Sequence, residues 1–195
     1  CRANARYVRL RQTTVHTPVL RPLNLAEVRV YGIPTVQANV VDAAMSSTWP
    51  WGGDYQASKC IDGDLTNMCQ SRGNDAAWLE LDLGSMAEIR YVEVFNRFTT
   101  DVGVLVRLGT YVLETSVDGT TFTECGQFDA GTGDASPYVD TCRANARYVR
   151  LRHIPRDKEV EHLHLAEVRV YIVPTAQVNV AAAALSSPFW NGNYQ

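Results

Sequence analysis

The stretch CRANARYVRLR at Cys142–Arg152 and the stretch LAEVRVY at Leu165–Tyr171 decide the fold. In both, apolar side chains alternate with polar or charged ones, and this period of two is typical of strands that bury one face. The alternation also assigns the faces, because Val168 and Val170 then point into the core and Glu167 points away from it. Both stretches are therefore predicted to be half-buried β-strands.

The same two stretches occur earlier in the chain without a change, at Cys1–Arg11 and Leu25–Tyr31. Cys1 and Cys142 are 141 residues apart, which is the size of a domain rather than of a short solenoid repeat. We predict tandem copies with almost no linker. The expected division is the C-terminal part of a preceding repeat at 1–35, a complete domain at 36–175, and the N-terminal part of a following repeat at 176–195.

Further alternating runs lie inside the complete repeat, at Trp78–Leu83, Ile89–Phe95 and Tyr111–Val117. Turn signals bound them, such as Gly84-Ser85 and Asp118-Gly119. No segment sustains the apolar rhythm of a helix for three turns. About eight short strands with frequent turns predict an all-β sandwich or jelly roll.

Composition excludes several classes of function. The net charge is -3, so no basic field favours nucleic acid as a partner. Alternation places Arg150 and Arg152 on one solvated face, where acidic residues balance them. No apolar run is long enough to span a membrane.

The five cysteines indicate disulfides. Cys1 and Cys142 occupy the same position in successive copies, which leaves four cysteines per repeat. The spacing favours the pairs Cys60–Cys69 and Cys125–Cys142 over reduced, buried thiols, with Cys1 bonded to an upstream repeat. Disulfides imply an oxidising, extracellular setting.

Seven motifs follow one another in the order of a known family. The series resembles the discoidin, or coagulation factor 5/8 type C, domain, and especially its F-type lectin (fucolectin) branch. The resemblance covers residues 39–171 and implies an eight-stranded jelly-roll β-sandwich of the galactose-binding-domain-like kind. The motifs are ASKCIDGD at 57–64, WLELDLG at 78–84, VEVFNR at 92–97, RLG at 107–109, SVDG at 116–119, ARYVRL at 146–151 and LAEVRVY at 165–171.

Oxygen-bearing side chains crowd the loop KCIDGDLTNMCQS at Lys59–Ser71, and calcium prefers six to eight such oxygens on a flexible loop. A turn stabilised by its own Asp side chains, with a surface glutamate and no metal, would also fit this loop. The resemblance implies a structural calcium ion here. The ligands that it implies are Asp62, the carbonyls of Lys59 and Asp64, an oxygen of Thr66 or Asn67, the carbonyl of Ala166 and the carboxylate of Glu167.

The sugar site of the lectin branch does not carry over. The resemblance implies a His after the calcium loop, where this chain offers Gln70, Ser71 and Arg72. It also implies an Arg where Glu80 stands, and a second basic residue soon after Asp82, where none is found. Standard fucose recognition is therefore not predicted.

Two further features remain as candidate contacts. Trp49 and Trp51 lie in an expected apex loop, where they meet a ligand or a neighbouring repeat, or cap the core. Together with Arg72 and Glu80 they are the candidate contact residues. His162 and His164 have the spacing of a transition-metal pair. Because the first copy carries Pro22 and Asn24 there, the preferred interpretation is that both histidines are surface side chains that bind no metal.

No catalytic motif stands out, and the chain is predicted not to be an enzyme. The favoured function is an extracellular structural or adhesive protein, in which calcium-stabilised tandem domains build a fibre or surface stalk. Its partners would be copies of itself. The alternative is a multivalent lectin with a non-standard sugar site, which gains avidity from repetition.

Overall fold

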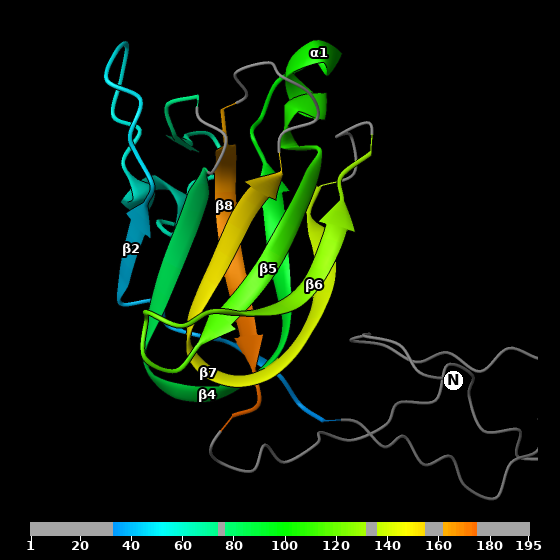
Figure 1. Cartoon of the computed structure of the whole chain (residues 1–195). Helices are drawn as coiled ribbons and strands as arrows, with labels where there is room; N and C mark the ends of the chain where they lie inside the picture. The colour runs from blue at the N-terminus through cyan, green and yellow to red at the C-terminus, as the bar shows by residue number, and fades with distance from the viewer. Residues whose placement is uncertain (1–32, 74–76, 132–135, 155–161, 175–195) are drawn as a thin grey trace, which may run out of the picture. The chain divides into compact units, whose positions relative to one another are not determined.

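The computed structural model describes residues 33–73, 77–131, 136–154 and 162–174, and the predicted parts of the neighbouring repeats fall almost wholly outside these ranges. The described residues form an antiparallel β-sandwich (Figure 1). Its strands are β1 Val36–Gln37, β2 Asp42–Met45, β3 Cys69–Gln70, β4 Trp78–Asn96, β5 Thr110–Ser116, β6 Thr123–Asp129, β7 Tyr138–Ile154 and β8 His164–Ile172. The helical turns are η1 Ala57–Cys60, α1 Val102–Leu105 and η2 Val106–Leu108.

Two long strands belong to both layers. The first half of β4 pairs with β2 and with the second half of β7, whereas its second half pairs with β8 and the first half of β7. The strand bends where the pairing shifts register, between Asp82 and Ala87. Gly84 lies at this bend with a φ of 74°, a value that glycine adopts readily. The predicted turn at Gly84-Ser85 is therefore wrong, since it is a bend within one strand.

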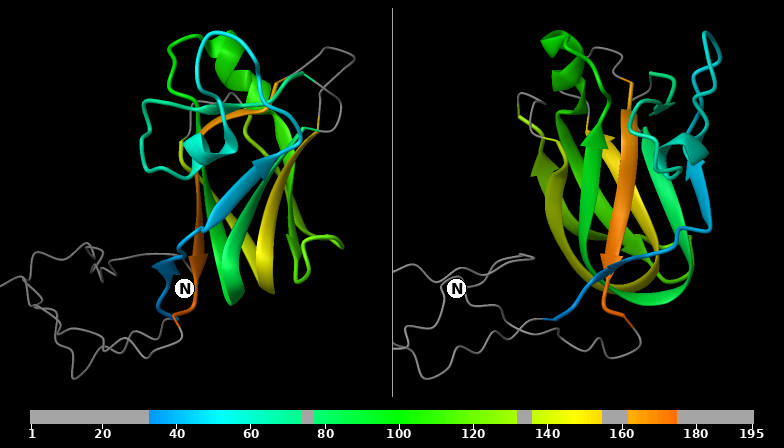
Figure 2. Two further views of the ribbon diagram at one scale, coloured as in Figure 1. Left: turned by 90° about the vertical axis from the view of Figure 1, so that its left-hand side faces the viewer. Right: turned by 180° about the vertical axis from the view of Figure 1, so that it is seen from behind.

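The hydrogen-bonded order is β1-β8-β4-β7-β5-β6, with β2 added to β4 and β3 added to β8. One layer holds β2, β5 and β6 with halves of β4 and β7, and the other holds β1, β3 and β8 with the remaining halves. The eight-stranded all-β sandwich predicted from the sequence is confirmed, and Figure 2 shows the two layers.

The core lies between these layers. Val168 and Val170 point into it, as predicted, and are at most 2% exposed. The disulfide Cys125–Cys142 joins β6 to the first half of β7, and Cys60–Cys69 joins η1 to β3. Both predicted disulfides are present. The fully buried large side chains are Leu79, Leu81, Ile89, Leu108, Tyr111, Leu113, Leu151, His153, Leu163, His164, Leu165 and Glu167.

The sandwich has two different ends. At one end lie α1 and the long loop between β2 and η1, and we call it the apical end (Figure 1). At the other end, the base, β4 and β7 bend and β1 lies beside the last residues of β8. The chain enters and leaves the sandwich at the base, so the apical loops are free of both connections.

Candidate functional site

A pocket opens at the apical end, between the loop that precedes η1 and the segment that follows β4. Its volume is about 210 Å³. Three segments that are far apart in sequence line it, with the residues Asp54, Tyr55, Thr66, Asn67, Met68, Arg97 and Phe98. The structure thus places Thr66 and Asn67 of the predicted calcium loop next to two aromatic side chains and a guanidinium group.

Two residues of this lining each carry a buried polar atom without a hydrogen-bond partner, Nε of Arg97 and Oδ1 of Asn67. Buried polar atoms nearly always have a partner, and leaving one unpaired costs about 1–3 kcal/mol. One of these atoms is a donor and the other is an acceptor. The residues that line the pocket therefore include one unsatisfied donor and one unsatisfied acceptor, and both of these atoms are buried.

An aromatic cluster stands beside this pocket on the loop between β2 and η1. The rings of Trp49 and Trp51 are 5.1 Å apart and nearly perpendicular, and Trp49 meets the ring of His162 in the same way at 4.8 Å. Trp51 is 68% exposed, whereas Trp49 is partly buried between its two neighbours. Trp51 therefore presents an exposed aromatic ring, and Trp49 packs against it edge to face.

The other two candidate contact residues, Arg72 and Glu80, lie on different parts of the fold: Arg72 follows β3, whereas Glu80 is on β4. The backbone amide of Arg72 donates to Oγ of Ser47, and its Nε donates to the carbonyl of Thr48. Arg72 is therefore tied to the start of the aromatic loop. Glu80 lies on the outer face of β4, where its carboxylate pairs with Arg150 at 2.7 Å, and it does not line the pocket.

His162 and His164 are not freely exposed surface side chains, because His162 is partly buried and His164 is buried. His164 is 1% exposed, and its Nε2 lies 3.3 Å from the carbonyl oxygen of Val104 in α1. Burial, followed by the charges of Arg97 and Arg107, lowers the pKa of His164 to about 3. The interpretation of His164 as a surface side chain is therefore wrong, because the ring is a neutral, buried contact beneath the apical segments.

The predicted calcium loop is a tight turn closed by the Cys60–Cys69 disulfide. The carboxylate of Asp64 accepts hydrogen bonds from both the amide and the hydroxyl of Thr66, which hold the pKa of Asp64 below its usual range. The amide nitrogen of Asn67 donates to Asp62 at 2.8 Å. Lys59 also approaches Asp62, at 3.6 Å. The carboxylates of this loop thus lie side by side.

The last strand contributes the other predicted ligands. Glu167 points away from the core, as predicted, but the loop covers it, so that it is only 2% exposed. The neighbouring residue, Ala166, is 1% exposed. Among the described residues no three His, Cys, Asp or Glu side chains gather as a metal cluster. The carboxylates of Asp62 and of the buried Glu167 nevertheless suit a hard cation that carbonyl oxygens also bind.

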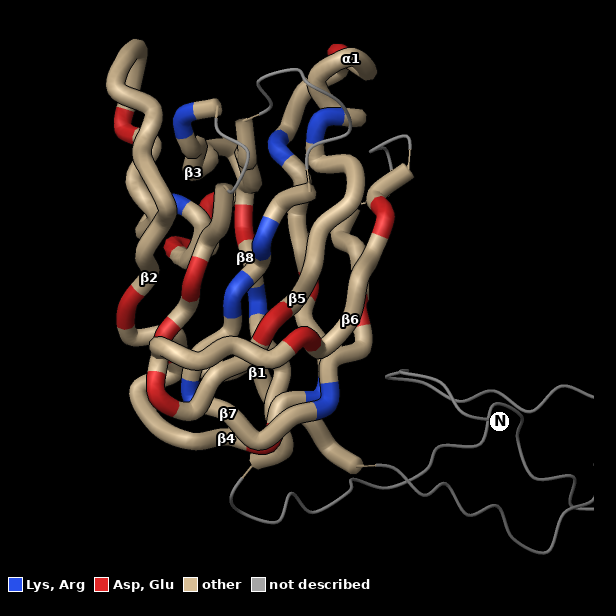
Figure 3. Tube along the Cα trace, in the orientation of Figure 1, with Lys and Arg blue, Asp and Glu red and all other residues tan. Residues whose placement is uncertain are grey.

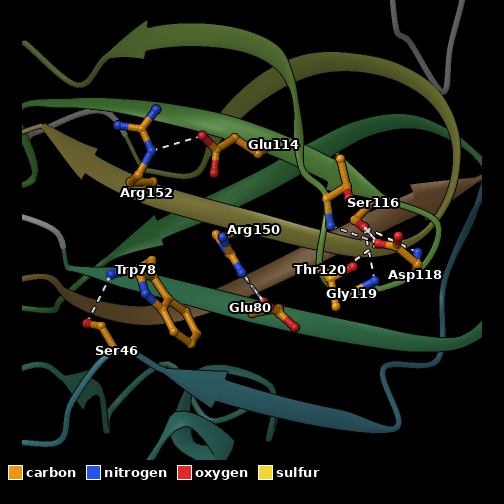
Figure 4. Close-up of polar contacts among 11 residues, drawn as sticks. Ser46, Trp78, Glu80, Glu114, Ser116, Asp118, Gly119, Thr120, Arg150 and Arg152 are labelled. Atoms are coloured by element: carbon orange, nitrogen blue, oxygen red, sulfur yellow. Dashed lines mark hydrogen bonds and ion pairs between the residues drawn. The ribbon is translucent and has the colours of Figure 1, made fainter.

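Three arginines of β7 form a charge-compensated surface rather than a basic stripe. Arg150 pairs with Glu80, Arg152 pairs with Glu114, and Arg147 pairs with Asp82, at 2.7 to 2.9 Å. Figure 4 shows the first two pairs on neighbouring strands, and Figure 3 shows basic and acidic segments side by side on this face. The face therefore presents alternating charge.

Sequence reasoning missed much of the pocket lining, because Tyr55, Arg97 and Phe98 were not among the candidates. A usable signal exists, since Arg97 and Phe98 directly follow an alternating strand whose partner strand begins beside the calcium loop. The family resemblance instead implied basic residues at the position of Glu80 and shortly after Asp82. Both belong to the half of β4 in the opposite layer, so the guanidinium of the pocket comes from the far end of the same strand.

Comparison with known proteins supports the fold. Residues 59–151 match the family model described as NedA-like, galactose-binding domain, of the F5/F8 type C kind. A search of curated protein sequences gave no match. The match and the structural similarities below assign the chain a galactose-binding-like β-sandwich fold.

Three similar solved structures are informative. A single-site mutant of chitosan-binding module 1, from a chitosanase/glucanase of Paenibacillus sp. IK-5, is 26% identical with a TM-score of 0.53, over 69% of this chain and 95% of that one. The lectin domain of lectinolysin, complexed with Lewis B antigen, is 25% identical with a TM-score of 0.55, over 66% and 90%. A fucolectin from the serum of Morone saxatilis (striped bass) is 22% identical with a TM-score of 0.55, over 68% and 45%.

Proposed function

We propose that this domain is a non-catalytic carbohydrate-binding module whose ligand enters the apical pocket. One observation carries the proposal. The residues that line the pocket combine an unpaired donor of Arg97 and an unpaired acceptor of Asn67 with the aromatic side chains of Tyr55 and Phe98. The similar chitosan-binding and Lewis B-binding domains support it.

This combination suits a sugar for physical reasons. A sugar ring has an apolar face of C–H groups, which packs on an aromatic side chain, and hydroxyl groups that both donate and accept hydrogen bonds. A volume of about 210 Å³ is below the range of about 300–1,000 Å³ typical for drug-sized ligands. The pocket therefore suits one sugar unit, with the rest of a chain extending over the exposed ring of Trp51.

Calcium would support this site from beneath. The carboxylates of Asp62 and Glu167 would hold the ion, together with an oxygen of Thr66 and the backbone carbonyls of Lys59, Asp64 and Ala166. The bound ion would supply positive charge between carboxylates that otherwise repel one another. Because Thr66 and Asn67 also line the pocket, ordering of this loop by calcium would order one wall of the sugar site.

The duplicated sequence favours a second, compatible function. Successive copies would form an extracellular tandem array, with the disulfides suited to an oxidising setting. Both chain connections of the described domain lie at the base, so each copy of such an array would keep its apical pocket accessible. An adhesive stalk or fibre with many weak sugar sites gains avidity without stronger individual contacts.

The sugar site is tested with Arg97→Met, which keeps the apolar stem and removes the guanidinium. Hydrogen bonds to charged groups contribute about 1.5–3 kcal/mol, so affinity should fall about 10- to 100-fold. The full chain is screened on a printed glycan array that includes chitosan oligomers and Lewis B antigen, followed by titration calorimetry. Arg143→Met, an exposed arginine on β7, is the matched control. Binding that Arg97→Met leaves unchanged would reject the pocket.

The fibre is tested by electron microscopy of the native protein. Filaments whose repeat matches one domain or a small multiple are expected. Discrete particles alone would leave only the carbohydrate-binding function.

A further inference from the structure

The two copies of the repeat differ sharply in one short segment. Residues 153–164 read HIPRDKEVEHLH, and the corresponding residues 12–24 read QTTVHTPVLRPLN. The segments on both sides are identical in the two copies. Aligned from their common C-terminal flank, the two segments share Leu23 and Leu163 and no other residue.

The structure explains which residue is retained. The identical flanks are the strands β7 and β8, whose inward side chains form the core. Leu163, which both copies share, is 0% exposed and belongs to that core. His162 and His164, on either side of it, point away from the core and differ in the other copy, where Pro22 and Asn24 stand. Leu163 of the core is thus retained in both copies, whereas the residues that differ on either side of it contact the apical segments.

His162 supports the first of the two segments that flank the pocket. Its ring meets Trp49 edge to face at 4.8 Å, and its Nδ1 lies 3.2 Å from the carbonyl oxygen of Ser71. The loop that begins with Trp49 continues into Asp54 and Tyr55, which line the pocket. Proline has no aromatic ring and no side-chain nitrogen with hydrogen-bonding capacity, so Pro22 cannot reproduce either contact.

His164 supports the second flanking segment. Because the neutral ring donates through Nε2 to the carbonyl oxygen of Val104, it ties β8 to the helical turn α1. The segment that carries α1 begins with Arg97 and Phe98 on the opposite side of the pocket. Asparagine also has an N–H donor, but its side chain is shorter, so the same hydrogen bond would require the segment to move inward.

We propose that His162 and His164 are positioning residues that set which sugar the apical pocket selects, and that the copy with Pro22 and Asn24 selects a different one. This inference rests on the proposed carbohydrate-binding function. The two histidines act through Trp49 and Val104, by fixing the separation of the two segments between which the sugar lies. Repeats that share the same last two strands would then present different specificities.

The test replaces both histidines in the full chain by the residues of the other copy, His162→Pro with His164→Asn. Wild type and variant are compared on the same printed array of chitosan oligomers, Lewis B antigen and mannuronic acid oligomers, and the dissociation constants of the two best ligands are measured. We expect the ratio of these two constants to change at least tenfold. A uniform weakening that leaves the ratio unchanged overturns the inference, because a purely structural role predicts that result.

Two controls make the outcome specific. Val173→Ile also installs the residue of the other copy, but at the base, where the backbone of Val173 bonds to Glu88, and it should leave the ratio unchanged. His162→Phe and His164→Gln retain the aromatic edge and the N–H donor, respectively, and should preserve the wild-type ratio. If the double variant folds poorly, His164→Asn alone is measured against His164→Gln, and equal ratios for the two overturn the inference.

Failure of the inference is distinct from failure of the proposed function. A wild-type chain that binds no glycan, or binds independently of Arg97, rejects the carbohydrate site itself. A wild-type chain that binds through Arg97, with selectivity that both histidine replacements leave intact, rejects only the positioning role.

Discussion

The backbone amide of Gly63 donates a hydrogen bond of 3.1 Å to Oε2 of Glu167, across 104 residues of sequence. It attaches the disulfide-closed loop to the last strand of the sandwich. The glutamate is buried by this contact, and burial raises its pKa, because the charged form loses water. Arg169 offers partial compensation at 3.4 Å. A cation in the loop would stabilise the carboxylate further.

Calcium is therefore expected to stabilise the folded chain. At a concentration of about 100 times its dissociation constant, one bound ion adds about 2.7 kcal/mol to the free energy of unfolding. For a chain of this size the melting temperature should then rise by roughly 5–10 °C. Differential scanning calorimetry in calcium and in EDTA measures this rise.

Variants locate the ion. Glu167→Gln and Asp62→Asn should each abolish most of the calcium-dependent rise, whereas Glu88→Gln, at an exposed acid on β4, should retain it. The same rise in Glu167→Gln as in wild type would place the ion elsewhere. No rise at millimolar calcium in wild type would reject the ion.

A second acid links stability to pH. The hydroxyl of Tyr111 donates to Asp140 inside the sandwich, and burial raises the pKa of Asp140 above its usual value. Its folded pKa exceeds its unfolded pKa, so its stabilising contribution is complete below about pH 3.8 and is lost as pH rises through the folded pKa. Asp140→Asn should remove this dependence, as measured by urea unfolding from pH 4 to 7. An unchanged pH profile in this variant would contradict the assignment.

Asp118 should show the opposite sign. Its carboxylate caps the turn between β5 and β6 by accepting from the amides of Thr121 and Thr120, and these bonds lower its pKa. Figure 4 shows Asp118 beside Thr120 in this turn. Its contribution is therefore present above the unfolded pKa and lost as pH falls. Asp118→Asn should weaken the chain at neutral pH and converge with wild type in acid. Parallel urea-unfolding curves for this variant and Asp140→Asn would refute this contrast.

The strand pattern could be predicted because alternation is a local property. Val168 and Val170 alternate with polar neighbours, and the burial of their side chains follows from that alone. The continuity of β4 could not be predicted, because Gly84-Ser85 is chemically a turn signal. Only the pairing of both halves of β4 with β7 decides that the strand bends instead of ending.

The closed loop at Lys59–Ser71 could be predicted because a single segment carries it. This predicted calcium loop is contiguous in sequence, and its closing disulfide follows from the spacing of Cys60 and Cys69. The pocket is assembled from three distant segments, so Arg97 has meaning only beside Tyr55 and Asn67. The burial of His164 could not be predicted either. Its hydrogen-bond partner is the backbone carbonyl of Val104, and a backbone carbonyl leaves no signal in the sequence.

Gly84 should be needed for the bend in β4. An added Cβ would lie 3.1 Å from Cγ1 of Val41, and φ is positive, which costs other residues about 1–2 kcal/mol. Gly131 has φ of 56° with nothing within 4 Å of an added Cβ, so it isolates the backbone cost. Gly84→Ala should therefore lower the free energy of unfolding by about 1 kcal/mol more than Gly131→Ala, since close packing adds strain. Equal losses in urea titrations would show that Val41 moves aside freely.

Trp51 should affect binding without affecting folding. Its ring is 68% exposed, so Trp51→Ala removes little buried area and should leave the melting temperature within about 1 °C of wild type. Aromatic packing contributes about 0.5–1.5 kcal/mol beyond area, so affinity for a chitosan oligomer should fall about 2- to 13-fold. A single glucosamine unit, which the pocket alone would hold, should bind equally well to both proteins. Met86→Ala, at a side chain that is 51% exposed at the base, is the control. Equal losses for oligomer and monomer would instead assign Trp51 to the pocket itself, and no loss for either would remove it from the site.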